Sequence, residues 1–179
     1  KLEKNWETYP VFHIDFNNAD FTEAGKLASV IKGYVTSWER IYGKSPDFED
    51  IGNRFAYVLE QAHKQTGRRA VVLIDEYDAP IQQAWEHGFY TECIAFMKQF
   101  LGSVLKGNRD LDFAVLTGVL RVAKESIFSD LNNLDVCSVM DAAYREVIGF
   151  TPQEVAQMAE DLTMAEALPD LKKWYDGYL

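Results

Sequence analysis

Two adjacent carboxylates, Asp75 and Glu76, directly follow an uninterrupted apolar run over residues 70–74. An apolar strand that ends in Asp-Glu has the form of a Walker B motif. In that motif the Asp holds Mg²⁺, directly or through water, and the Glu orients and deprotonates the attacking water. The alternative is that the two carboxylates only begin a solvated loop. We interpret Asp75 as a metal and cofactor ligand and Glu76 as a catalytic base.

Two more polar residues follow the next predicted strand along the chain. Thr117 ends that strand, at the position where P-loop ATPases place a sensor of the γ-phosphate. We interpret Thr117 as a cofactor-binding and catalytic residue, although a Thr that merely ends a strand would look the same. We also interpret Arg121 as a catalytic residue, which could reach a phosphate oxygen as a sensor or finger; its alternative is a surface Arg near Asp130 or Asp135.

Asp78 has two interpretations. Ala79 and Pro80 follow it and form a helix-start signal, which favours Asp78 as a helix N-cap. Asp78 could instead join Asp15 and Asp75 in an acidic metal cluster, because hard cations favour carboxylate oxygens. Such a cluster would support phosphoryl transfer or nucleic-acid cleavage without a phosphate loop.

No phosphate-binding loop is found in the sequence. The segment 43–45, Gly-Lys-Ser, resembles the end of a Walker A loop, but Trp38 stands where the first Gly is required. A helical pattern, not a strand, precedes the segment, and Pro46 follows it. We therefore predict that the Walker A loop is missing from this chain and that the chain alone is inactive.

The elements that must position these residues alternate along the chain. Apolar runs rich in β-formers predict strands at residues 10–16, 70–74 and 111–116. Strands that alternate with helical intervals indicate βαβ units and a parallel sheet. The predicted fold class is therefore α/β with a parallel sheet.

Helical periodicity fills the intervals between the strands. Apolar residues recur at three- and four-residue steps from Phe21, and Asp20 with Glu23 supplies a capping box for that helix. A second helix is predicted over about residues 47–66, and one or two more over residues 78–107.

The pattern is looser beyond Arg121. It predicts a short helix near residues 124–131, an apolar segment near 136–139, and two final helices, one opened by a capping box of Thr151 and Glu154 and one over about 168–175. We divide the chain after residue 149. Residues 1–149 are then a truncated ATPase core, and residues 150–179 are the start of a C-terminal helical, lid-like segment.

Composition excludes several classes of protein. With 28 acidic and 18 basic residues the formal net charge is −10, so direct binding of nucleic acid by this chain is not expected. No apolar run approaches the ~20 residues needed to span a membrane. The two cysteines and three histidines lack metal-site spacing, and Cys93 and Cys137 fit reduced thiols in the cytoplasm. The start at Lys1 and the aromatic-rich end at Leu179 fit a piece of a longer protein.

Four ordered segments resemble the AAA-ATPase-like domain found in many bacterial proteins, over about residues 9–178: VVLIDEYDAPI, LTGVLRVAKESIFSDLNNL, IGFTPQEV and LKKWYDGY. The resemblance implies a P-loop NTPase-like core of AAA type with a C-terminal helical segment. It also implies a Walker A strand and loop upstream, a restriction-like nuclease-fold domain that often follows, and use of ATP and Mg²⁺. Arg121 matches the Arg of the family's TGVSR-like segment, but Leu120 stands where the family often has Ser.

These observations support three hypotheses. The first is an ATP-binding and ATP-hydrolysing module that regulates an attached or partner effector, such as a nuclease, and that could form a homo-oligomer. The second is a degenerate interaction domain that does not hydrolyse ATP. The third is the carboxylate-metal site described above.

Overall fold

The structure is a computed structural model of the chain, and it describes residues 7–17, 19–119, 127–128, 131, 134–138, 141 and 149–175. The chain divides into two compact units, Lys1–Leu134 and Asp135–Leu179. The domain boundary predicted from the sequence, after residue 149, falls within the second unit. Arg121, Leu120 and most of the helix predicted near 124–131 lie outside the described residues.

The first unit is built on a three-stranded parallel sheet. Its strands are β1 (Val11–Asp15), β2 (Ala70–Asp75) and β3 (Leu111–Leu116), in the order β1-β2-β3. Asp15 pairs with Asp75, and Ile74 pairs with Leu116. The predicted α/β fold with a parallel sheet is therefore confirmed, and β2 is the central strand.

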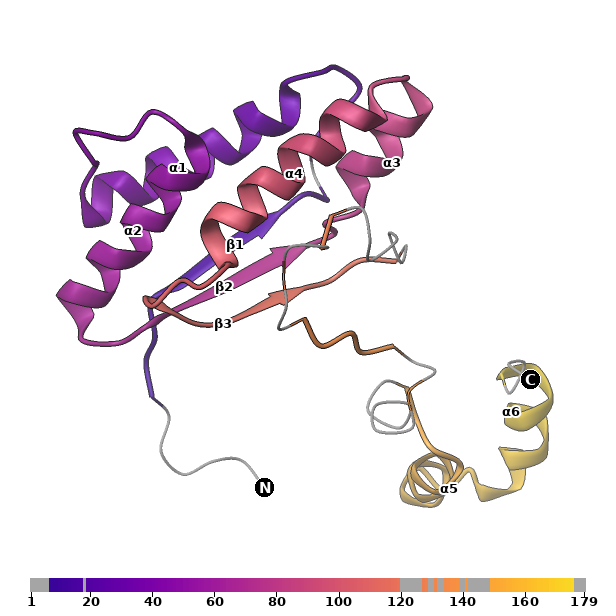
Figure 1. Cartoon of the computed structure of the whole chain (residues 1–179). Coiled ribbons are helices and arrows are strands. Elements are labelled where there is room, and N and C mark those ends of the chain that lie inside the picture. Colours follow the sequence, from indigo (N-terminus) through magenta and orange to yellow (C-terminus); the bar gives the residue numbers. More distant parts are fainter. Residues whose placement is uncertain are drawn as a thin grey trace. The chain divides into compact units, whose positions relative to one another are not determined.

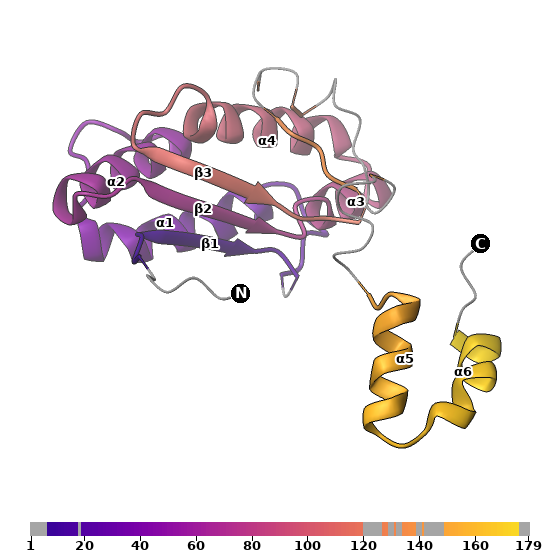
Figure 2. The same cartoon turned by 90° about the horizontal axis from the view of Figure 1, so that it is seen from below.

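Four helices connect the strands: α1 (Lys26–Tyr42), α2 (Ile51–Thr66), α3 (Ala79–Glu86) and α4 (Tyr90–Leu105). Each new strand is added on the same side of the one before, and β-α-β crossovers are right-handed. Both crossovers must then pass over the same face of the sheet. Figures 1 and 2 show α1, α2 and α4 together on one face, with the other face open to the viewer in Figure 2.

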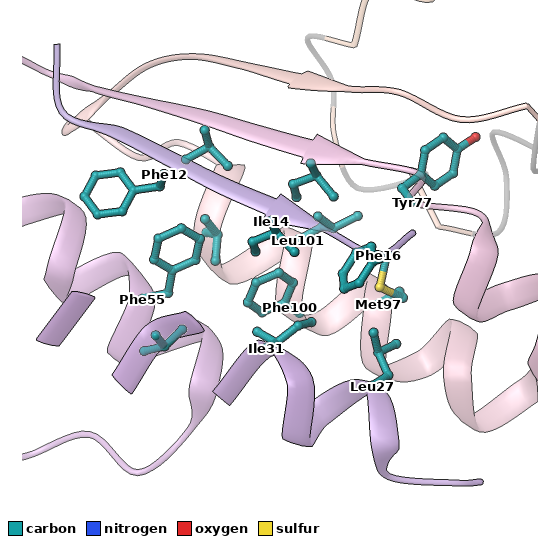
Figure 3. Close-up of a cluster of buried hydrophobic side chains, with 14 of the residues drawn as sticks. Phe12, Ile14, Phe16, Leu27, Ile31, Phe55, Tyr77, Met97, Phe100 and Leu101 are labelled. Carbon is teal, nitrogen blue, oxygen red and sulfur yellow. The ribbon is translucent and has the colours of Figure 1, made fainter. Parts of the chain in front are cut away.

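The core lies between the sheet and these helices. Alternate residues of the strands point into it, among them Phe12 and Ile14 of β1, which are fully buried. Phe55 of α2 stacks on the ring of Trp38 with ring centroids 4.8 Å apart, and on Phe100 at 6.1 Å. Figure 3 shows Phe12, Ile14, Phe55 and Phe100 meeting beneath the strands. The helices are thus held to the sheet by one continuous apolar layer.

The start of α1 differs from the prediction. The helix begins at Lys26, and its N-cap is Gly25, which has a left-handed conformation at φ 83°. The Asp20 carboxylate instead accepts a hydrogen bond from the Thr22 N–H, at 3.0 Å, in a turn. The predicted capping box of Asp20 with Glu23 is therefore wrong. The physical reason is that a tertiary bond fixes the segment before the helix, because the Phe21 N–H donates to Gln83 Oε1 at 2.8 Å.

Helix α2 begins at Ile51, four residues after the predicted start. Asp50 is its N-cap, in an extended conformation, and its side chain accepts a hydrogen bond from the Asn53 N–H at 3.0 Å. Between Asp78 and residue 107 the structure has two helices, α3 and α4.

The second unit contains α5 (Pro152–Asp161), a short 3₁₀ turn, η1 (Ala165–Ala167), and α6 (Leu168–Tyr175). The predicted capping box is confirmed, because Thr151 and Glu154 exchange side-chain and backbone hydrogen bonds. In the part of the chain that the structure describes, no helix is long and apolar enough to cross a membrane.

Candidate functional site at the carboxyl ends of β2 and β3

The central strand ends at Asp75, and the next residue changes the direction of the chain. Glu76 has φ 54°, in the left-handed region that residues other than Gly rarely adopt. Such a conformation costs of order 1 kcal/mol and persists only when the surroundings enforce it. Here the Glu76 carbonyl accepts a hydrogen bond from the Ala79 N–H at 3.0 Å, which closes the turn into α3.

Thr117, the first residue after β3, connects this turn to the neighbouring strand. Its hydroxyl donates to Asp75 Oδ1 and accepts from the Glu76 N–H at 3.4 Å. Its backbone N–H donates to the Ile74 carbonyl at 2.9 Å, and its carbonyl accepts from the Tyr77 N–H at 3.0 Å. The structure therefore brings Asp75, Glu76 and Thr117 together at one rim of the sheet.

The cluster is open to solvent. Asp75 and Glu76 are partly exposed, and Thr117 is exposed. In open α/β sheets, ligands bind outside the carboxyl ends of the strands, which is where these three residues lie. A carboxylate beside a hydroxyl offers the oxygen ligands that Mg²⁺ favours.

Asp78 is the N-cap residue of α3, as predicted, but its side chain forms no capping hydrogen bond with the helix. Asp78 has a helical conformation, with φ −87° and ψ −17°, whereas a capping residue has non-helical angles that turn its side chain back onto the helix amides. Its carboxylate instead reaches the end of β3, where Oδ2 accepts a hydrogen bond from the Val119 N–H at 3.1 Å. Asp78 is only 3% exposed.

Gly118 lies against this turn. A Cβ atom built on Gly118 would stand 2.4 Å from Asp78 Oδ1 and 2.8 Å from Tyr77 Cε1. A side chain at position 118 would therefore force the turn after β2 or the segment after β3 to shift. This role of Gly118 and Asp78 was not predicted from the sequence, where the only signal is a Gly directly after a strand-ending Thr.

The three-carboxylate cluster is not formed. Asp15 is the neighbour of Asp75 in the sheet, but Asp15 Oδ1 accepts from the Asn17 N–H at 2.8 Å, and the Asp78 carboxylate is directed to Val119. Among the described residues no group of three or more His, Cys, Asp or Glu side chains could hold a metal ion.

The Gly-Lys-Ser segment at residues 43–45 lies far from these carboxylates. It belongs to the loop between α1 and α2, on the side of the sheet where the strands begin (Figure 1). Ser45 is buried, and its hydroxyl accepts from the Asp47 N–H at 3.1 Å.

Cys93 lies in the apolar layer, as its position on a helical stripe predicted. It is 6% exposed, and its thiol donates to the Pro80 carbonyl at 3.7 Å. Burial raises the pKa of the Cys93 thiol to about 11, so the thiol stays protonated at neutral pH and is a poor nucleophile.

Residues 1–128 match the family described as "Predicted AAA-ATPase", and the chain belongs to this family. The chain is also 34% identical over 176 residues to a protein of Azotobacter chroococcum mcd 1 described as "Uncharacterized protein in vnfD 5'region". The aligned part is 95% of this chain and 33% of that protein, so the chain spans about a third of this relative's length. No solved structure matches the chain.

Proposed function

We propose that this chain is the part of an ATPase module that carries the Walker B carboxylates and the sensor, and that its phosphate loop lies outside these residues. The observation that carries the proposal is the hydrogen-bonded group of Asp75, Glu76 and Thr117 at the carboxyl ends of two adjacent parallel strands. Membership of the AAA-ATPase family supports the use of a nucleotide and Mg²⁺ in general.

The residues present fit a magnesium ion. Asp75 would hold it, and the Thr117 hydroxyl, already bonded to that carboxylate, would lie beside it. When bound, Mg²⁺ neutralises charge on the phosphate oxygens. Asp75 thereby connects the ion to the central strand, which is the most deeply buried strand of the sheet.

Glu76 is the proposed base. It follows the metal ligand directly, is partly exposed and is held in a left-handed turn by the bond from its N–H to Thr117. A carboxylate on a turn whose backbone is fixed in this way can accept a proton from a water molecule beside the phosphate. Arg121 is proposed, on the family resemblance alone, to contact a phosphate oxygen of the same or a neighbouring molecule.

The whole protein would use this module to control an effector, such as a nuclease, in the cytoplasm. The relative of Azotobacter chroococcum is about three times as long as the aligned part, which leaves room for such a domain in a protein of that length. A domain that binds a partner without hydrolysing ATP is the second candidate function, and the experiment below distinguishes it.

The test uses a longer protein that contains this chain together with its phosphate loop. We expect Glu76→Gln to lower kcat for ATP hydrolysis at least about 100-fold while ATP still binds. Asp75→Asn should remove the Mg²⁺ dependence of ATP binding. The matched control is Glu86→Gln, at an exposed position of α3, which should leave hydrolysis unchanged. Absence of hydrolysis in the unaltered protein would support the non-hydrolysing interaction domain.

A further inference from the structure

Asp78 differs from the other buried polar side chains among the described residues. Glu39 and Arg54 pair with each other between α1 and α2, and Ser45 closes a local turn. The Asp78 carboxylate instead contacts the backbone that leaves a different strand, β3. The proposed function assigns no role to Asp78.

The Asp78 carboxylate contacts the backbone after β3 at two residues, Gly118 and Val119. The Val119 N–H donates to Asp78 Oδ2 at 3.1 Å, and Gly118 leaves no space for a Cβ beside Asp78 Oδ1 and the Tyr77 ring. The Tyr77 ring is itself held edge-on against Phe128, with ring centroids 5.4 Å apart. Residues 118–119 therefore contact the turn that follows β2 through the Val119 N–H and the Cα of Gly118, while both residues remain exposed to solvent on their other side.

Thr117 lies directly before residues 118–119 and is exposed to solvent. Its hydroxyl must stay between Asp75 and the Glu76 N–H if it is to hold a ligand or sense a phosphate. Its backbone N–H and carbonyl are bonded to the Ile74 carbonyl and the Tyr77 N–H, so its remaining freedom depends on the residues that follow it. Those residues are the ones that Asp78 holds.

We propose that Asp78 is a positioning residue. By binding the Val119 N–H it fixes the segment 117–119, and through that segment it keeps the Thr117 hydroxyl on Asp75 and the Glu76 N–H. This inference rests on the proposed function, because Thr117 acts on nucleotide only there. Asp78 is too deeply buried to touch the ligand itself.

The kinetic test uses the same longer protein and four variants. Asp78→Ala removes the acceptor, and Asp78→Asn keeps an oxygen that the Val119 N–H can use. We expect Asp78→Ala to lower kcat about 10-fold or more, a free-energy change of about 1.4 kcal/mol, with KM for ATP within about 3-fold, and Asp78→Asn to restore most of the rate. Combined with Thr117→Ala, Asp78→Ala should add little further loss, because both changes remove the same placed hydroxyl.

The matched control is Asp50→Ala. This change also removes a carboxylate that accepts from a backbone N–H, at the start of α2, so it should lower the melting temperature and leave kcat unchanged. Fully additive losses for Asp78→Ala and Thr117→Ala, or an Asp78→Asn variant as slow as Asp78→Ala, would overturn the proposal.

Amide hydrogen exchange on the 179-residue chain separates this inference from the proposed function. Asp78→Ala should speed exchange at Val119 and also at Glu76 and Thr117, and Asp78→Asn should restore protection. Faster exchange at Val119 alone would show that Asp78 does not position Thr117, whether or not ATP is hydrolysed. If exchange changes as expected but the longer protein does not hydrolyse ATP, the proposed function is refuted. The role of Asp78 in holding residues 117–119 would still stand.

Discussion

The two faces of the three-stranded sheet have different surroundings, although the same strands form both. On the covered face Phe12, Ile14 and Val72 are fully buried beneath α1, α2 and α4. On the open face Val11 is 52% exposed, and Phe113 is 50% exposed. Figure 2 looks onto this open face. Strands of a parallel sheet are usually apolar on both sides because helices cover both, yet here the connections described can cover only one.

The strand register connects this difference to the site. Val11, Val71 and Phe113 lie in one row across the sheet. The next row on the same face, two residues further on, is His13, Leu73 and Val115, and the row after it contains Asp15 and Asp75. Because side chains alternate between faces, the Asp75 side chain belongs to the open face. The covered face therefore supplies stability, and the open face leads into the candidate site.

The largest effect should come from removing volume on the covered face. Phe55→Ala deletes a ring that is fully buried and packed on Trp38 and Phe100, so it should cost about 4 kcal/mol of unfolding free energy. Phe113→Ala, the same change on the open face, should cost less than about 1 kcal/mol. Urea unfolding of the 179-residue chain measures both. Equal costs would mean that the open face is buried in solution.

The covered side also holds a buried ion pair. Arg54 donates to both Glu39 oxygens, at 2.8 and 2.7 Å, and this bonding lowers the pKa of Glu39 from its ordinary value of 4.5. Glu39→Gln leaves the guanidinium without its charge partner and should cost about 3 kcal/mol near neutral pH.

The pH dependence of stability follows from the direction of that shift. A carboxyl whose folded pKa is depressed stabilises the fold above its unfolded pKa, and this stability is lost as pH falls through the folded pKa. Unfolding free energy measured from pH 7 downward should therefore fall below about pH 4.5. Glu39→Gln should flatten that fall, and an unchanged slope would show that other carboxylates cause it.

Local sequence patterns were sufficient for the strands and for the main site. Each predicted strand lies within a residue or so of its observed position, because an apolar run bounded by turn residues is a local signal. Asp75 and Thr117 could be placed at one rim because parallel strands end on the same side of a sheet. Their roles in binding and catalysis stay predictions.

Tertiary contacts decided what the sequence did not reveal. The start of α1 moved because the Phe21 N–H binds Gln83, sixty-two residues away. Asp78 was misread because its helical backbone angles and the approach of Val119 depend on how β3 packs beside β2. At positions 20 and 78 the sequence has residues that often cap helices. Hydrogen bonds to distant residues, Phe21 to Gln83 and Val119 to Asp78, take the place of the side-chain caps.

A smaller effect is expected where the open face reaches the site. Gly118→Ala would place a methyl group 2.4 Å from Asp78 Oδ1, so the turn or the segment after β3 must shift, at a cost of about 2 kcal/mol. The control is Gly102→Ala in α4, where nothing lies within 4 Å and Ala favours the helix. Thermal unfolding of both variants checks the contrast. A neutral Gly118→Ala would show that this contact is looser than the structure has it.

The smallest effect should follow a change of polarity without a change of volume on the open face. Val115 is 44% exposed, so Val115→Thr should alter the unfolding free energy by less than about 0.5 kcal/mol. Val72→Thr buries the same hydroxyl on the covered face, where Val72 is fully buried, and should cost about 1–3 kcal/mol. If Val115→Thr were as costly as Val72→Thr, sedimentation velocity would show whether a second copy covers the face. If Val115→Thr were that costly and the protein were a monomer, the result would contradict the exposure of this face, because a hydroxyl in contact with water has no desolvation penalty.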